Sequence, residues 1–556
     1  MAGQPLGPRL TLEEQVAQVV MAVWSGDVDR LAGLVAAGRL GGLFIPPGAF
    51  ASARALAATL NHLQRLATYP LLVAGQFGAG PGSLPGGGPA LPGALALGAA
   101  RQPDLARRYG ALVAAEARAV GINLVLAPVL DVHREPDHLP YLPESFGENP
   151  SLVARLGAAF VEGCREGRVL AAAPGFPGRG SAVHDAGREL TILPQNRQAL
   201  EKIDLHPYAA ACRAGLGAIT TGHLHVSALD NLPNRLATHS SAVVEGLLRG
   251  SLRFRGLVLT DNLDAPAVRV RYTPEVAAVL AFAAGHDLLV TESPEAVYQA
   301  LYEVVLHSDV PRARLQQAVQ RVWAAKTWLG LPTTRFAGND LPDPAPRAAL
   351  AREVARAGLT VVRGNRRLLA GRLPLLLAVR APGVRHPFEA DLQALAAHCL
   401  APAPFRAVAS PLAPPQVDEL LSEGERVEAA VIFVDLPPHV PAVEAAGLCA
   451  AVATLVRALQ HQALPVAVVL LGNPYALALV DDADLLLHAA SDAPACLEAA
   501  LACLVGHLDP RGRLPVTRAE AGQATPPWAR RPGVPSSCQW LSRPAPVDTD
   551  APTGPR

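Results

Sequence analysis

The chain has 556 residues, half of them hydrophobic, and its 48 basic and 48 acidic side chains give a formal net charge of zero. This length exceeds what a single hydrophobic core usually organises, so it predicts two large domains. The balanced charge gives no electrostatic case for nucleic acid, and the absence of a long uninterrupted apolar run argues against a membrane span.

The first residues of the chain and its cysteines indicate a cellular compartment. The stretch from Met1 to Pro5 lacks a basic segment followed by an apolar one, so the sequence predicts no secretory signal. The seven cysteines are scattered and form no CxxC pair, which favours reduced thiols over disulfides or zinc. Together these features predict a cytoplasmic protein.

The first half of the chain alternates short apolar runs with longer helical patterns. Residues 11–14 form a capping box, and valines at 16, 19 and 20 continue it at helical spacing, which predicts an opening helix. Helices are expected at 104–120, 151–165 and 241–248, and strands at 42–45, 71–74, 124–127, 169–172, 218–220, 257–259 and 288–290. This alternation predicts a parallel sheet, either a TIM-like (β/α)₈ barrel, which we favour, or an open doubly wound sheet.

The second half of the chain predicts a separate α/β domain. Residues 331–347 are rich in Pro, Asp and Asn and indicate a linker between domains at 1–330 and 348–518. Apolar runs at 359–362, 375–379, 430–434, 466–471 and 484–487 predict an open parallel sheet of α/β sandwich type. Residues 519–556 are Pro-rich and are predicted to be disordered.

Asp261 follows the apolar run at 256–259 after a single threonine, where a buried parallel strand would end. In a barrel, carboxyl ends of strands carry catalytic groups, although an acid there can also accept backbone N–H bonds for purely structural reasons. Asp131 and His223 also follow apolar runs, and we interpret them as members of local hydrogen-bond networks. The neighbouring histidines at 223 and 225 lack carboxylates at metal-binding spacing, so no metal and no cofactor are predicted.

Six segments, at 127–132, 144–150, 176–180, 256–263, 470–475 and 509–515, form a recognisable combination. Together they resemble family 3 glycoside hydrolases, in particular the bacterial β-N-acetylhexosaminidase branch. The resemblance implies a TIM-like barrel followed by an α/β sandwich domain, and retaining hydrolysis through a carboxylate nucleophile and a proton donor. Asp261 matches the family's nucleophile.

The residue that donates the proton in the family that this sequence resembles is replaced here. In this branch an Asp-Ser-His motif supplies the proton through its His, and the corresponding residue here is Gly187, which cannot transfer one. His184 and Asp185 are the neighbouring groups that could act as a replacement acid.

The positions that grip the sugar are also changed. The family's hydroxyl-binding Asp corresponds to Gly75, and its Lys-His pair corresponds to Pro174 and Gly175. The family's Arg before Ser-Phe-Gly-Glu corresponds to Glu144, and the second His of Lys-His-Phe-Pro-Gly-His-Gly corresponds to Arg179. Both new charges are interpreted as solvated loop residues, with an ion pair or new ligand contacts as the alternatives.

Three functions are consistent with this pattern. The first is a family member with weak or no family-type activity that binds a carbohydrate, such as an amino-sugar glycoside or a muropeptide-like ligand, or an unidentified protein partner. The second is an active glycosidase of altered specificity that uses Asp261 with His184 or Asp185. The third is a purely structural role. Residues expected to contact a substrate are Gln76, Asp131, Glu144, Arg179 and His223.

Overall fold

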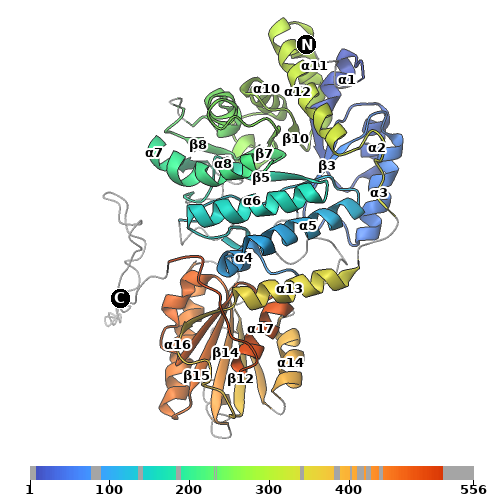
Figure 1. Ribbon diagram of the computed structural model, residues 1–556. Helices are drawn as coiled ribbons and strands as arrows, with labels where there is room; N and C mark the ends of the chain where they lie inside the picture. Colours follow the sequence, from blue (N-terminus) through green and yellow to red (C-terminus); the bar gives the residue numbers. More distant parts are fainter. Residues whose placement is uncertain are drawn as a thin grey trace, which may run out of the picture.

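A computed structural model gives the fold in two parts, a barrel above and an open sheet below (Figure 1). The structure describes residues 8–76, 89–134, 142–182, 190–230, 232, 234–338, 343–380, 388–400, 403–409, 419, 420, 422, 427–436 and 442–517. The predicted disordered tail lies outside these ranges.

The first sheet is an eight-stranded parallel barrel within the described residues, which confirms the barrel and rules out the open doubly wound alternative. A bridge between Leu259 and Leu288 joins the two end strands and closes the ring. Around the barrel the strands are β10 (Leu289–Thr291), β1 (Val20–Val23), β2 (Gly42–Ile45), β3 (Leu72–Gly75), β4 (Leu124–Val125), β5 (Leu170–Phe176), β7 (Ala218–Thr221) and β9 (Leu257–Thr260). A small parallel pair, β6 (Thr191–Leu193) and β8 (Leu224–Val226), lies outside the ring.

Helices surround the barrel because alternate strand residues point outward. Val20 and Ala22 of β1 pack against the helices, while Met21 between them packs inside the barrel. The larger helices are α1 (Leu12–Gln18), α2 (Val28–Ala36), α3 (Ala53–Leu66), α4 (Ala94–Ala100), α5 (Pro103–Ala119), α6 (Pro150–Glu166), α8 (Leu205–Arg213), α10 (Pro274–Ala284), α11 (Pro294–Leu306) and α12 (Asp309–Trp328). Short helical segments are η1 (Leu142–Glu144), α7 (Arg197–Ala199), η2 (Leu200–Asp204), η3 (Ala237–His239), η4 (Ala242–Ser251) and α9 (Pro266–Arg269).

The opening helix is shorter than its valine spacing predicts. Thr11 and Glu14 form the expected capping box, but α1 ends at Gln18. The next residues form β1, which pairs with both β10 and β2. The prediction that Val20 belongs to the helix is therefore wrong: its β-branched side chain suits a strand equally well, and pairing on both sides decides the outcome.

The second sheet has six strands in the described residues and is mixed. Its order is β11 (Thr360–Arg363), β16 (Leu485–Ala489), β15 (Val466–Gly472), β14 (Ala429–Leu436), β12 (Pro374–Arg380) and β13 (Phe405–Ala409). Strand β11 runs antiparallel to β16, so the expectation of a purely parallel sheet is wrong at this edge. The flanking helices are α14 (Phe388–Cys399), α16 (Ala442–His461), α17 (Pro494–Leu504) and the short η5 (Pro474–Leu479).

Helix α13 (Pro344–Gly358) connects the two parts and belongs to both cores. Leu350, Ala351 and Val354 pack into the barrel core, and Ala355 packs into the core of the second domain. The helix begins inside the segment predicted to be a linker. The domain boundaries at 330 and 348 stay predictions.

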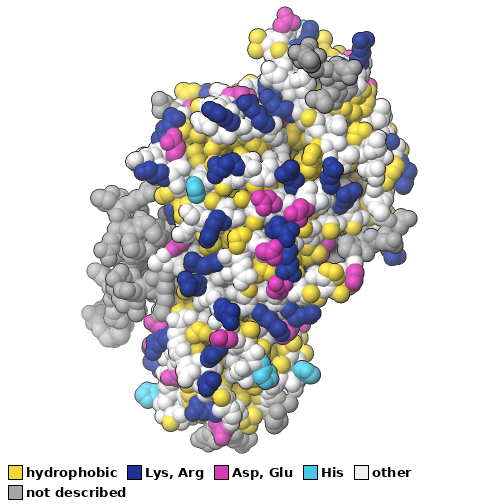
Figure 2. Space-filling model, in the orientation of Figure 1, with side chains coloured by type: hydrophobic (Ala, Val, Ile, Leu, Met, Phe, Trp, Pro, Cys, Tyr) yellow, Lys and Arg dark blue, Asp and Glu magenta, His cyan; other side chains and the backbone are white. Residues whose placement is uncertain are grey.

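The surface matches the balanced composition. In Figure 2 basic and acidic side chains are interspersed over the face that carries α5 and α6. In the part of the chain that the structure describes, none of the helices is both long enough and apolar enough to span a bilayer.

Candidate functional site at the barrel mouth

The carboxyl ends of the barrel strands bring four of the singled-out positions to one end of the molecule. Gly75 ends β3, Pro174 lies in β5, His223 closely follows β7, and Asp261 directly follows β9. Because these strands are parallel, their carboxyl ends surround a single mouth. His223 Nε2 lies 2.8 Å from the carbonyl oxygen of Asn262, so it sits beside the residue that follows Asp261.

A buried ion pair occupies one side of this mouth. Asp131 accepts hydrogen bonds from the backbone N–H of Arg179 at 2.8 Å and from its Nε at 2.9 Å. The Asp131 and Arg179 side chains are 2% and 9% exposed. The interpretation of Arg179 as a solvated loop charge is therefore wrong, because the Phe176–Gly180 loop turns it inward. Asp131 lies in a local hydrogen-bond network, which agrees with its interpretation from the sequence.

Glycine at position 175 makes room for this pair. Gly175 has a φ of +78°, and a Cβ atom there would lie 2.4 Å from Arg179 Nε. Any side chain at 175 would therefore collide with the guanidinium in its present place. The two departures from the family pattern, glycine at 175 and arginine at 179, are thus sterically complementary.

Glu144 joins the same group of charges. Burial raises the pKa of Glu144, the positive charge of Arg179 opposes that shift, and the negative charge of Asp131 adds to it. A hydrogen bond from the Gln76 side chain also lowers the pKa of Glu144. The structure thus brings Gln76, Asp131, Glu144 and Arg179 together, and Glu144 is not the solvated residue that its loop position indicates.

Two further charged residues belong to this group and were missed in the sequence. Arg134 Nη2 and Asp204 Oδ1 are 2.6 Å apart, and Asp204 is 1% exposed. Burial raises the pKa of Asp204 to about 6, although the Arg134 charge opposes that shift. A Cβ atom on Gly178 would lie 3.4 Å from the Cβ of Asp204 and 3.9 Å from Asp131 Oδ1, so the two acids flank this glycine. A lone acid in a helical stretch carried no signal of this role.

His223 is held by hydrogen bonds through both ring nitrogens. Nε2 donates to the Asn262 carbonyl, and Nδ1 lies 3.0 Å from Thr238 Oγ1. The Thr238 hydroxyl contacts that of Thr221 at 3.2 Å, and Thr221 in turn contacts His286 Nε2 at 2.8 Å. Burial lowers the pKa of His286 to about 3, so its ring is neutral near pH 7. This chain of contacts fixes the orientation of the His223 ring, which agrees with its structural interpretation.

Asp261 itself is exposed at the rim. Its Oδ1 accepts a hydrogen bond from the backbone N–H of Asn262 at 2.8 Å. Among the described residues it has no ion-pair partner. His184, Asp185 and Gly187, which bear on proton donation, lie outside the described residues. The described part of the chain holds no cluster of three or more His, Cys, Asp or Glu side chains that could bind a metal ion.

Comparison with known proteins identifies the family. The model of the glycosyl hydrolase family 3 N-terminal domain matches residues 11–325, and the chain belongs to this family. Curated relatives of this chain include proteins named β-hexosaminidase and β-N-acetylglucosaminidase. A β-N-acetylglucosaminidase/β-glucosidase of Cellulomonas fimi is 28% identical over 373 residues, covering 63% of this chain and 64% of that protein. A β-hexosaminidase of Alkalilimnicola ehrlichii is 33% identical over 272 residues, covering 47% of this chain and 76% of that protein.

Solved structures agree with this placement. A family 3 β-N-acetylglucosaminidase from Paenibacillus superposes with a TM-score of 0.78 and 25% identity, covering 92% of this chain and 99% of that one. The sequence matches are less complete. This chain spans 64% of the Cellulomonas fimi protein and 50% of the β-hexosaminidase A of Pseudoalteromonas piscicida.

Proposed function

We propose that this family 3 protein binds a carbohydrate of the amino-sugar type at its barrel mouth and hydrolyses glycosides weakly or not at all. The buried Asp131–Arg179 pair beside Gly175 supports the weak hydrolysis, and membership of the family supports a carbohydrate ligand. In the family pattern, positions 174 and 175 supply a Lys and a His to the sugar. Here Arg179 fills the space of the missing side chain, and its charge faces Asp131 instead of a ligand.

The expected loss of rate is large. A hydrogen bond to a charged group contributes about 1.5–3 kcal/mol, and several such donors are replaced. General acid catalysis contributes roughly 10²- to 10⁴-fold, and Gly187 stands at the position of the donor. A retained carboxylate at position 261 could then react only with a leaving group that needs no protonation.

An active glycosidase of altered specificity is the second candidate. The exposure of Asp261 favours it, because an acid at the end of β9 remains accessible and has no ion-pair partner among the described residues. In this case His184 or Asp185 would act as the acid.

Hydrolysis assays separate the two candidates. Purified protein should release little product from natural β-N-acetylglucosaminides, some from activated aryl β-N-acetylglucosaminides, and Asp261→Ala should not change the rate on natural substrates. Asp309→Ala, a fully exposed acid on α12, is the matched control. Efficient cleavage of natural substrates that Asp261→Ala abolishes and Asp309→Ala preserves would contradict the proposal.

Two further measurements complete the test. If the enzyme is active, His184→Ala and Asp185→Ala should be compared, because loss of rate on poor leaving groups with retained rate on activated ones identifies the acid. If it is inactive, stabilisation of the native state by N-acetylglucosamine or its oligomers distinguishes a binding protein from a purely structural one.

A further inference from the structure

A cavity lies at the opposite end of the barrel from the mouth. It has a volume of about 450 Å³ and lies between α6, α12 and the amino-terminal ends of β5, β7 and β9. Gly217 and Gly256, which precede β7 and β9, form part of its lining. Its volume falls in the range of about 300–1,000 Å³ that small-molecule sites occupy.

The lining of this cavity carries positive charge only. Arg165, Arg255 and Arg321 line it, and no acidic side chain does. Among the described residues, neither the Arg165 nor the Arg255 side chain has a hydrogen-bond or ion-pair partner. The remaining lining is mostly apolar and includes Trp328. Two guanidinium groups are therefore available to a ligand beside an apolar wall.

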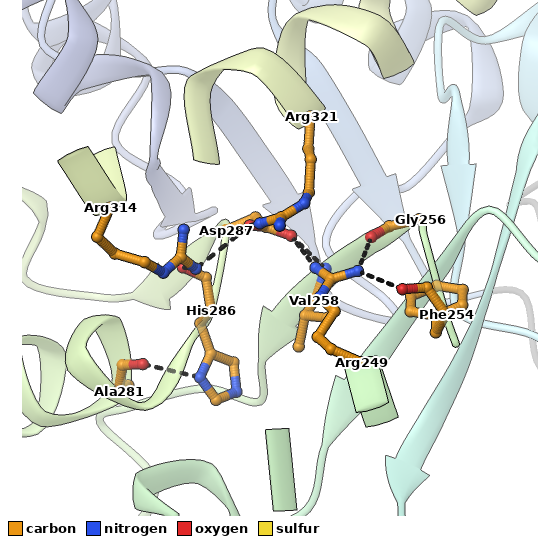
Figure 3. Close-up of polar contacts among 9 residues, drawn as sticks. All are labelled: Arg249, Phe254, Gly256, Val258, Ala281, His286, Asp287, Arg314 and Arg321. Carbon is orange, nitrogen blue, oxygen red and sulfur yellow. Dashed lines mark hydrogen bonds and ion pairs between the residues drawn. The ribbon is translucent and has the colours of Figure 1, made fainter. Parts of the chain in front are cut away.

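The third guanidinium is fixed in position by a buried acid. Arg321 Nη1 lies 2.9 Å from Asp287 Oδ1, and the Arg321 side chain is 29% exposed. Asp287 is fully buried and also pairs with Arg249 at 2.5 Å and Arg314 at 3.3 Å. Figure 3 shows the three arginines converging on this one carboxylate.

The buried cluster leaves an excess of positive charge. Its three guanidinium groups face one carboxylate, and Glu245 is the other acid whose charge acts on Arg249 and Arg314. Two acids against three arginines leave one net positive charge behind the cavity, and the two unpaired arginines in the lining add two more. This excess of positive charge raises the local affinity for an anion.

We propose that this cavity binds a small organic anion, with a phosphate or carboxylate head held by Arg165, Arg255 and Arg321 and an apolar or aromatic body against Trp328. Guanidinium groups match the geometry of both head groups through paired N–H donors. A cation is disfavoured by three arginines, and a neutral sugar would find no acidic acceptor in the lining. This proposal is independent of the function of the mouth, because the two sites lie at opposite ends of the barrel.

Calorimetric titration of the full chain tests the proposal. The probes are naphthyl phosphate, naphthoate, inorganic phosphate and the neutral naphthol. Naphthyl phosphate or naphthoate should bind at least about ten-fold more tightly than both naphthol and inorganic phosphate, since both the charge and the apolar body contribute. Whichever of the two anions binds more tightly identifies the head group.

Single substitutions localise the binding. Arg165→Gln and Arg255→Gln should each weaken it by about ten-fold or more, as expected for loss of a charge-assisted hydrogen bond. Both side chains are exposed, so the fold should persist, and equal melting temperatures would verify this. Arg155→Gln, an exposed arginine on the same helix α6 that does not line the cavity, should leave binding unchanged.

Three results would overturn the proposal. They are absence of binding by both naphthyl anions up to about 1 mM, binding of naphthol as tight as that of the anions, and unaltered binding in the Arg165→Gln/Arg255→Gln double variant.

Discussion

Replacing Lys326 with Met should make the stability of the protein less dependent on pH between about 7 and 9. Lys326 is completely buried on α12, and its Nζ donates a hydrogen bond to Gln18 Oε1 at 2.5 Å. No acid pairs with it among the described residues. Burial lowers the pKa of Lys326 from 10.5 to about 7, so the folded protein holds it neutral over most of this range.

The sign follows from proton binding in the two states. Between about pH 7 and 10.5 the unfolded chain keeps this lysine protonated and the folded protein does not, so protons favour unfolding and stability rises with pH. One proton corresponds to about 1.4 kcal/mol per pH unit. Lys326 is about half protonated in the folded protein at pH 7. Its contribution should therefore raise the free energy of unfolding of the wild type by about 2 kcal/mol from pH 7 to 9. The measurements stop at pH 9 because burial raises the pKa of Cys212, Cys496 and Cys503 from 9.0 to about 11. Above pH 9 these thiols make the stability fall as the pH rises.

The assay is denaturant unfolding of the wild type and Lys326→Met at several pH values in this window. The variant should show a smaller rise in unfolding midpoint with pH, and its advantage over the wild type should be greatest near pH 7. Lys202→Met, which changes the other lysine of the chain at an exposed position, should keep the wild-type slope. A Lys326→Met variant with the full wild-type slope would refute the argument, because Lys326 would then be charged in the folded protein.

Two substitutions at the mouth test the packing around Arg179. Gly175→Ala should lower the melting temperature more than Gly38→Ala, because both glycines have positive φ but only the Cβ at 175 would meet another group, at 2.4 Å from Arg179 Nε; equal losses would mean that backbone strain alone is responsible. Asp131→Asn should cost about 3–5 kcal/mol in the free energy of unfolding, since it leaves the buried guanidinium without its counter-charge. Glu201→Gln breaks an exposed pair and should cost less than about 1 kcal/mol, and a similar cost for both would show that the buried pair is screened.

The barrel could be predicted from the sequence because most of its strands are continuous apolar runs separated by helical patterns. Strand β1 could not, because its valines match helical spacing and only pairing with β2 and β10 reveals their state. Strand β13 was also missed. Its sequence, Phe405 to Ala409, includes an arginine that interrupts the apolar run, and pairing with β12 stabilises it.

The sequence predicted which residues lie at the mouth, but it did not predict which of their side chains are buried. Asp261 and His223 follow apolar runs, which place them at strand ends. The burial of Arg179 and Glu144 depends on the path of the loops and on the space that Gly175 leaves beside Arg179. The periodicity of a single sequence indicates neither of these. The Arg134–Asp204 pair joins residues 70 positions apart, so only the folded structure shows it.

Helix α13 decides where this protein can be cut for expression. Arg347 lies within the segment predicted as a linker, yet its Nη1 is 2.6 Å from Glu116 Oε2, and both side chains are buried. A barrel fragment that stops before residue 344 would leave Glu116 without this counter-charge and would uncover the apolar surface that Leu350 and Val354 protect. We therefore expect a barrel fragment to need the chain through Gly358. A fragment of the second domain that starts beyond this helix would lose Ala355 and the packing it provides.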